Sequence, residues 1–208
     1  MRNVVCKAKF KTMTNRILTI LILTFIALIC RSQTDLMDNS LNYLPDISIN
    51  NFSLHKPTGL FIDKDNFKQN LNQVSLPFSY LLILNKTQDQ YFKLTYYPGG
   101  TYDQFSYFEI GQIKIDTLNK QIKYKISDED NFTSETNIKI GISKNDFIRI
   151  KGNDFIKTKS DLDKLFYQLK IDSDTTGFLK NYNMPIYDAI YHFRSDTLIK
   201  FEFGFEYP

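Results

Sequence analysis

Three residues near the C-terminus have the side-chain types of a nucleophilic triad. His192, Ser195 and Asp196 lie close together in the sequence, but a triad needs its base between the nucleophile and the orienting carboxylate. These residues fall at the end of a predicted β-hairpin, where their side chains cannot converge in that order. We interpret them as a solvent-facing turn and the second histidine, His55, as a residue at a helix start, and we predict no catalytic residue.

Two sets of carboxylates are candidates for cation binding or hydrolysis. The residues from Asp172 to Gly177 are similar to the first half of an oxygen-ligand calcium loop, but Asn183 stands where the bidentate glutamate would be. We interpret this segment as a polar loop and predict neither a metal nor a cofactor. A carboxylate-based hydrolase would need Asp103 and Asp188 to pair across two repeats, and we keep that reading as a less favoured alternative.

A surplus of aromatic side chains around Pro98 is the most informative feature for function. One face of a sheet buries only every second residue, so some of these rings should reach the surface, where tyrosine favours contact with a partner. Packing in the core is the alternative for each ring. The candidate partner-binding surface, with another protein as the expected partner, consists of Tyr91, Tyr96, Tyr97, Tyr102, Phe105 and Tyr107.

Residues 1–32 have the pattern of a secretory signal peptide. A basic stretch without any acidic residue precedes an apolar run from Ile17 to Ile29, which is short for a membrane span of roughly 20 residues. We predict cleavage between Ser32 and Gln33 and export to the periplasm or the outside of the cell. Two alternatives would leave the chain on a membrane, namely lipidation of Cys30 and an uncleaved signal anchor.

Cleavage would change the charge and the cysteine content of the chain. Residues 1–32 contain six of the 26 basic residues and none of the 23 acidic ones, so the net charge changes from +3 to −3. A basic face for nucleic acid is therefore not expected. Both cysteines, Cys6 and Cys30, also belong to the predicted signal peptide. The mature chain would have no disulfide, thiol nucleophile or cysteine metal site.

The elements that position these residues are predicted to form a tether and two α+β units. Residues 33–50 are polar and are interpreted as the tether, with the units at 51–127 and 132–208. In the first unit we expect a short helix from Phe67 to Val74 and an antiparallel meander from Phe78 to Ile126. The boundary between the units is placed at an acidic stretch that breaks the alternation of the strands.

The second unit begins with the clearest helix signal of the chain. Ser143 and Asp146 form a capping box, Ile142 and Phe147 can close a hydrophobic staple, and Gly152 ends the helix. A helix of two turns is not stable alone. We therefore expect it to pack on an aromatic hairpin at the C-terminus.

The register of that hairpin follows from its side chains between Tyr187 and Glu206. The alternating apolar residues of both strands share one face only if Phe193 pairs with Ile199, and the connection must then contain three or five residues. Tyr191 is then opposite Phe201, and Ala189 is opposite Phe203. Lys200, Glu202 and Glu206 are expected to face water.

An internal repeat and a family resemblance complete the prediction. Tyr102-Asp-x-Phe-x-Tyr-Phe108 matches Tyr187-Asp-x-Ile-x-His-Phe193. The segment Ile138 to Gly152 is similar to the opening motif of the SmpA/OmlA (BamE) and β-lactamase-inhibitor-like fold, and the C-terminal pattern resembles secreted proteins of the Bacteroidota. The resemblance implies short paired helices on a small antiparallel sheet.

The sequence as a whole predicts an α+β protein made of two tandem units of short helices on small sheets. Without a catalytic or metal-binding constellation, we expect an exported, non-enzymatic binding module of the periplasm or cell envelope. An envelope-assembly accessory, or an inhibitor or immunity protein, is the alternative that the resemblance implies. A signal-anchored membrane-surface protein is a further alternative.

Overall fold

The computed structural model describes residues 45–75, 78–97, 100–152, 156–161, 164–172 and 177–206. The predicted signal peptide, most of the predicted tether and the centre of the loop similar to a calcium site lie outside these ranges. None of the helices within them is long and apolar enough to cross a membrane.

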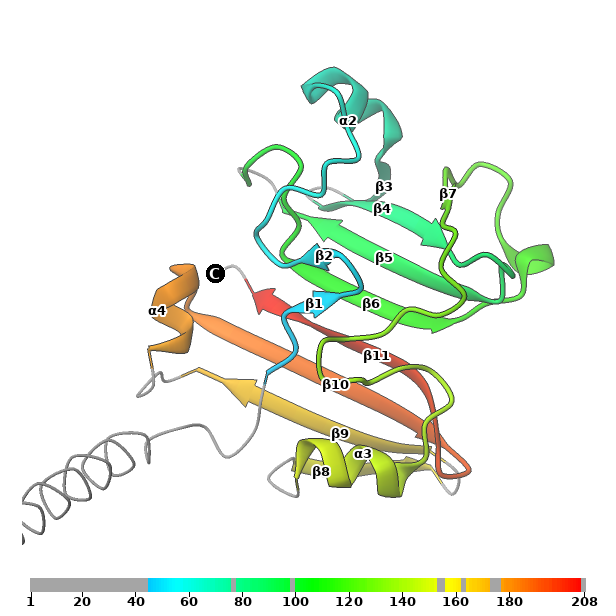
Figure 1. Ribbon diagram of the computed structural model, residues 1–208, viewed down its shortest axis with the longest axis vertical. Helices are drawn as coiled ribbons and strands as arrows, with labels where there is room; N and C mark the ends of the chain where they lie inside the picture. The colour runs from blue at the N-terminus through cyan, green and yellow to red at the C-terminus, as the bar shows by residue number, and fades with distance from the viewer. Residues whose placement is uncertain are drawn as a thin grey trace, which may run out of the picture. The chain divides into compact units, whose positions relative to one another are not determined.

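A single large sheet dominates the described part of the chain (Figure 1). Eight strands follow one another in an antiparallel path, and the short strand β7 (Lys125–Ile126) runs parallel to β4 beside the path. The order is β3 (Asn72–Ser75), β4 (Phe78–Leu84), β5 (Gln90–Tyr96), β6 (Tyr107–Gln112), β11 (Thr197–Glu206), β10 (Ile186–Arg194), β9 (Lys164–Ile171) and β8 (Ile156–Asp161). The α+β class is confirmed.

The two halves of the chain meet in this sheet at the pair β6 and β11. Phe108 is opposite Phe203, and Ile110 is opposite Phe201. The prediction of two tandem units with a small sheet each is therefore not confirmed, because the strands of both halves share one hydrogen-bonded path.

Helices and short strands cover one face of the sheet, which we call the inner face. Helix α3 (Lys144–Lys151) and the hairpin of β1 (Ser48–Ile49) and β2 (Phe52–Ser53) lie over it in Figure 1. Helix α2 (Lys64–Asn70) lies near the β3 end, and α4 (Phe178–Tyr182) lies near the end of β11. We call the opposite side of the sheet the outer face.

The core is aromatic and continuous across the inner face. Phe92 packs on Phe108 with ring centroids 5.0 Å apart, and Phe108 packs on Phe203 at 5.7 Å. All three rings are fully buried. Because this chain of edge-to-face contacts crosses from β5 to β11, both halves share one core.

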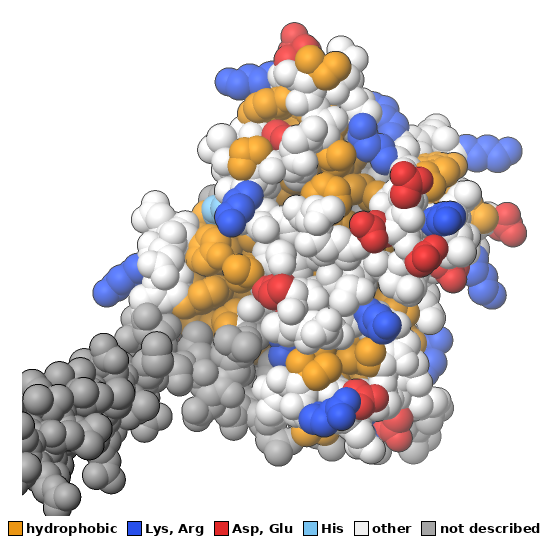
Figure 2. Space-filling view, in the orientation of Figure 1, with side chains coloured by type: hydrophobic (Ala, Val, Ile, Leu, Met, Phe, Trp, Pro, Cys, Tyr) orange, Lys and Arg blue, Asp and Glu red, His pale blue; other side chains and the backbone are white. Residues whose placement is uncertain are grey.

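Figure 2 views the covered side of the molecule and shows apolar side chains gathered beside α4. There Phe178 and Tyr182 pack on the buried Phe205, with ring centroids 5.9 and 4.7 Å away. The helix thus closes the core at the end of β11.

The position, the N-cap and the end of helix α3 confirm the sequence prediction. Ser143 is the N-cap, and its Oγ accepts a hydrogen bond from the amide of Asp146 at 3.1 Å. The hydroxyl also donates to the Asp146 carboxylate at 2.8 Å. Gly152 ends the helix with a φ of 81°. The buried Phe147 lies 4.7 Å from Tyr191 between ring centroids, so the helix does pack on the C-terminal hairpin.

The C-terminal hairpin has the predicted central register but a different end. Tyr191 pairs with Phe201 and Ala189 with Phe203, as expected. The connection contains two residues instead of three or five, because a β-bulge at Phe193 shifts its partner to Leu198. Leu198 is therefore fully buried, and Ile199, which was expected in the core, is only half-buried.

Several predicted elements of the first half are wrong. The helix expected from Phe67 to Val74 lies at Lys64–Asn70, because Asp63 caps it by accepting from the amide of Asn66. Strands expected after Ile113 are replaced by a short 3-10 helix, η1 (Ile115–Thr117), and by β7. Local alternation alone did not reveal that this segment leaves the antiparallel path of the sheet and returns only as the short parallel strand β7.

Two other expectations are corrected near the ends of the predicted units. Asp46 and Ile49, which were assigned to the tether, are both 0% exposed and belong to the fold. His55 does not begin a helix, and has a φ of 59° in a turn where its ring packs on Phe205 at 5.1 Å.

Candidate functional site

The outer face of the sheet carries polar and aromatic side chains instead of an apolar layer. Residues there alternate with the buried ones along β5, β6, β10 and β11, and most are half-buried, as expected for neighbours on an open sheet surface. The described α-helices α2, α3 and α4 do not belong to this side, which is bordered by the segment from Ile113 to Ile122 with the 3-10 helix η1. Its members at the centre of the sheet are Tyr91, Lys93, Tyr107, Glu109, Asp188, His192, Lys200 and Glu202.

Two glutamates organise a hydrogen-bonded network at the centre of the outer face. Glu109 accepts from the Tyr91 hydroxyl at 2.6 Å and lies 3.4 Å from Lys93 Nζ. Lys200 Nζ lies 3.5 Å from Glu109 and 3.4 Å from Glu202 and so bridges them. His192 Nε2 lies 3.0 Å from Glu202 Oε1. The network therefore spans four strands, from β5 through β6 and β11 to β10.

The environment of the outer face shifts the pKa values of its acids and tyrosines. Burial, followed by the charge of Glu109, raises the pKa of Tyr91, so its hydroxyl stays a proton donor. Burial also raises the pKa of Asp188, despite a hydrogen bond from Gln168 at 3.0 Å. Burial opposes the ionised form of Glu202 too, but the hydrogen bond from His192 and the charge of Lys200 outweigh it and lower that pKa.

A pocket of about 290 Å³ adjoins this network on the outer face. Tyr91 and Lys93 belong to both, and the segment from Ile113 to Ile122 forms the other wall of the pocket. The side chains on the sheet side also include Tyr80 and Leu82. The site therefore combines an apolar hollow with a charged, hydrogen-bonding border.

The six aromatic residues of the sequence prediction do not share one surface. Tyr91, Tyr97 and Tyr107 belong to the outer face, where Tyr97 packs on Phe78 with ring centroids 5.0 Å apart. Phe105 is 1% exposed and belongs to the core. Alternation along a strand sends neighbouring rings to opposite faces, which explains the division.

Tyr96 and Tyr102 lie on the covered side, against helix α2. Their rings pack on Phe67 at 5.0 and 5.4 Å, and their hydroxyls donate to the carbonyl oxygens of Gly100 and Phe61. Both line a second pocket of about 410 Å³ beneath the helix. Because their polar and apolar parts already have partners, we do not assign them to the candidate site.

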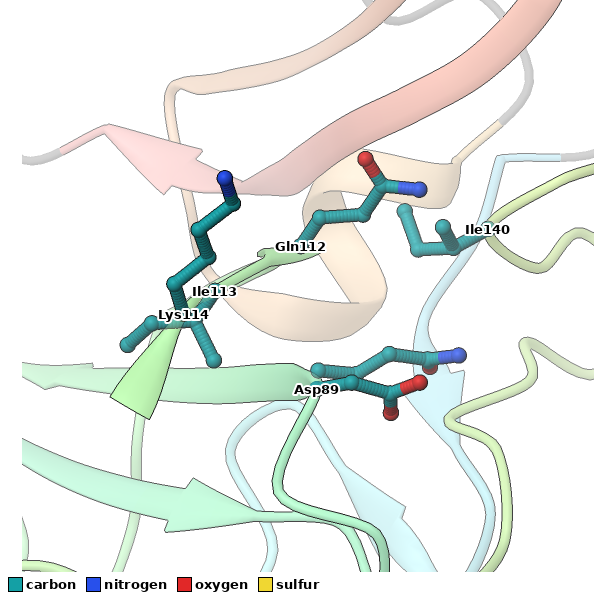
Figure 3. Close-up of a pocket in the computed structure, with 6 residues that line it drawn as sticks. Asp89, Gln112, Ile113, Lys114 and Ile140 are labelled. Carbon is teal, nitrogen blue, oxygen red and sulfur yellow. The ribbon is translucent and has the colours of Figure 1, made fainter. Parts of the chain in front are cut away.

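A third pocket, of about 360 Å³, lies at the end of the β5 and β6 hairpin (Figure 3). The Asp89 carboxylate in it accepts from Asn85 and Thr87, both at 2.7 Å, and these bonds lower its pKa. The ammonium of Lys114 extends away from Asp89 in Figure 3. The polar groups of this pocket therefore stabilise a loop and do not converge on a ligand.

The candidate catalytic groups of the sequence are not brought together. Asp196 pairs with Lys144 at 2.6 Å, while His192 contacts Glu202 across the strand pair, so the two cannot form a triad with Ser195.

The two carboxylates considered for a hydrolase also have separate partners. Asp103 accepts from the amide of Gly59 at 2.8 Å and from the Thr58 hydroxyl. Asp188 instead bonds to Gln168 on the outer face, so the carboxylate pair of a hydrolase is not formed.

The sequence analysis missed the glutamates at the centre of the outer face as site residues. The alternation of β11 already indicated that Lys200 and Glu202 face away from the core. The missing information was that β6 pairs with β11, which brings Glu109 next to Lys200. No signal in the sequence names that pair of strands.

Comparisons with known proteins assign no function to this site. No family model, no curated protein and no solved structure matches the chain.

Proposed function

We propose that the chain is an exported, non-enzymatic binding module whose contact surface is the outer face of the sheet. The observation that carries this proposal is the network across β5, β6, β11 and β10, because four strands direct tyrosine, glutamate, lysine and histidine to the side opposite the α-helices α2, α3 and α4. Export is supported by the signal-peptide pattern of residues 1–32.

A protein is the partner that suits this surface best. Tyrosines concentrate binding energy in protein interfaces, and the 290 Å³ pocket beside Tyr91 could hold one apolar side chain of the partner. Glu109, Glu202 and Asp188 lie on the same face as the lysines, so a phosphate backbone would be repelled. Charges of both signs favour a partner with a complementary pattern.

Affinity capture with matched surface variants tests the proposal. The full chain serves as bait in an envelope extract of the source cells, beside a variant with Phe78→Ser and Tyr97→Ser on the outer face. The control carries Ile62→Ser and Ile150→Ser, which change two exposed apolar residues of other segments. Circular dichroism shows whether each variant is folded.

We expect wild type and control to retain the same protein and the folded outer-face variant to lose it. Retention by the outer-face variant, or an equal loss in the control, would contradict the assignment of the surface.

A further inference from the structure

A buried ion pair connects the first described residues to helix α3. Lys151 Nζ lies 2.8 Å from Asp46 Oδ1, and the two side chains are 1% and 0% exposed. Lysine and aspartate are almost never buried so completely unless they are paired, as they are here. Removing both charges from water costs so much that an ion pair here is a weak source of stability. This arrangement needs a different explanation.

Hydroxyl groups surround the carboxylate of Asp46. Thr136 Oγ1 donates to Oδ1 at 2.6 Å, and the Tyr191 hydroxyl donates to Oδ2. The Tyr187 hydroxyl donates to the carbonyl oxygen of Asp46 at 2.7 Å and fixes its backbone. Donors on both carboxylate oxygens would stabilise the negative charge that develops there if a nucleophile attacked Cγ.

The amine of Lys151 is placed as such a nucleophile. Burial lowers its pKa, which favours the neutral amine that can attack a carbonyl carbon. Phe147, one turn earlier in α3, packs on Tyr191 at 4.7 Å and helps to keep water from the site. Holding the two groups in contact replaces an encounter in solution and gives a high effective concentration.

We propose that Lys151 and Asp46 react with each other and form an intramolecular isopeptide bond between Nζ and Cγ. A proton first passes from the ammonium to the carboxylate, which leaves a neutral amine and a carboxylic acid. The nitrogen lone pair then attacks Cγ. The bond from Cγ to the hydroxyl breaks, and the hydroxyl leaves as water with a second proton from nitrogen.

The reaction is balanced without an oxidant, a reductant or another co-reactant. One ammonium and one carboxylate become one neutral amide and one water molecule. Because the buried reactants are charged and the product is not, burial favours the amide more than water would.

The bond would act as a covalent staple of the fold. It closes a loop of about 100 residues, which strongly restricts the unfolded chain. The two cysteines of the sequence, Cys6 and Cys30, both precede Asp46 and belong to the predicted signal peptide. An isopeptide bond would therefore supply the cross-link that a disulfide cannot supply in the mature chain.

Mass spectrometry of the purified full chain tests the proposal directly. We expect an intact mass lower than that of the residues by one water molecule. A tryptic digest should contain a branched peptide in which the segment with Asp46 is joined to the segment from Ile150 to Lys157, since trypsin does not cleave after an acylated lysine. Separate, unmodified peptides from the folded protein would overturn the proposal.

Two controls separate this reaction from general lysine chemistry. Lys144 and Asp196 form an exposed ion pair of 2.6 Å, so their peptides in the same digest should stay unlinked. Lys151→Arg keeps a positive charge but removes the nucleophile, and its mass should show no loss of water. A water loss that persists in this variant, or linkage of Lys144 to Asp196, would overturn the assignment.

Discussion

The outer face contains two carboxylates whose pKa values shift in opposite directions. Asp188 faces Gln168, Lys170, Glu202 and Glu206, and burial with the two like charges makes its ionised form unfavourable. Glu202 is also buried, but His192 and Lys200 stabilise its ionised form. The same sheet surface therefore destabilises one carboxylate and stabilises the other at neutral pH.

We predict that Asp188→Asn makes the protein more stable at neutral pH. A raised pKa in the folded state means that stability from this group is greatest below the unfolded pKa of about 3.9 and is lost as the pH rises through the folded pKa. The neutral amide avoids this loss and should add roughly 1 kcal/mol at pH 7. Thermal unfolding of both proteins at pH 7 and pH 3 measures the difference, which should vanish at the lower pH.

Glu202→Gln is the matched control for this prediction and should have the opposite effect. Its lowered pKa gives stability that is present above the unfolded pKa of about 4.3 and is lost as the pH falls through the folded pKa. The variant should therefore be less stable than wild type at pH 7 and similar to it at low pH. Equal changes in stability for the two substitutions at pH 7 would contradict this assignment, because they would show that solvent screens the charges of the outer face.

At the scale of elements, the C-terminal hairpin is fixed by its turn and its bulge. Ser195 and Asp196 both have positive φ values, 46° and 62°, as a two-residue type I′ turn requires. The backbone carbonyl of Asp196 also accepts from the amide of Lys144, so the turn holds the start of α3. A residue better suited to the left-handed region should strengthen both elements.

Ser195→Asn should stabilise the protein by about 0.5 kcal/mol, because asparagine adopts positive φ more readily than serine. Ser195→Val should destabilise it, since a β-branched residue is strained in that conformation. Midpoints of urea unfolding at equal slopes provide the comparison. A loss of stability in the asparagine variant would mean that the serine hydroxyl has a structural role in the turn.

Helix α3 and the end of the C-terminal hairpin differ in how much of each is determined by near neighbours. The N-cap at Ser143 and the end at Gly152 could be predicted because each depends on contacts within one helix. The two-residue turn was not predicted, because the predicted register is uninterrupted and the β-bulge at Phe193 shifts the observed register.

At the scale of the whole molecule, the junction of β6 with β11 makes one sheet from two halves. The strands approach closely at Gly204, where a Cβ atom would lie 2.3 Å from the Ser106 carbonyl oxygen and 2.6 Å from Tyr107 Cα. At Gly111, also on the outer face, a Cβ would meet only the end of the Tyr91 ring, at 2.7 Å. Backbone atoms cannot move aside as a ring can.

Gly204→Ala should therefore destabilise the protein by about 3 kcal/mol, and Gly111→Ala by about 1 kcal/mol. Denaturant unfolding measures both changes. In a Tyr91→Ala background the cost of Gly111→Ala should fall, whereas that of Gly204→Ala should not change. Similar costs for the two glycine substitutions would indicate that the junction is not closely packed.

The sequence by itself determined what depends on near neighbours. It gave the α+β class, helix α3, the three meander strands β4, β5 and β6 in approximate position, and the central pairs of the last hairpin, because capping and alternation act over a few residues. Only the tertiary structure decided that β6 pairs with β11 and that Asp46 lies against Lys151. Backbone hydrogen bonds are nearly the same for every pair of strands, so packing over the whole chain selects the partners, and no local pattern records that choice.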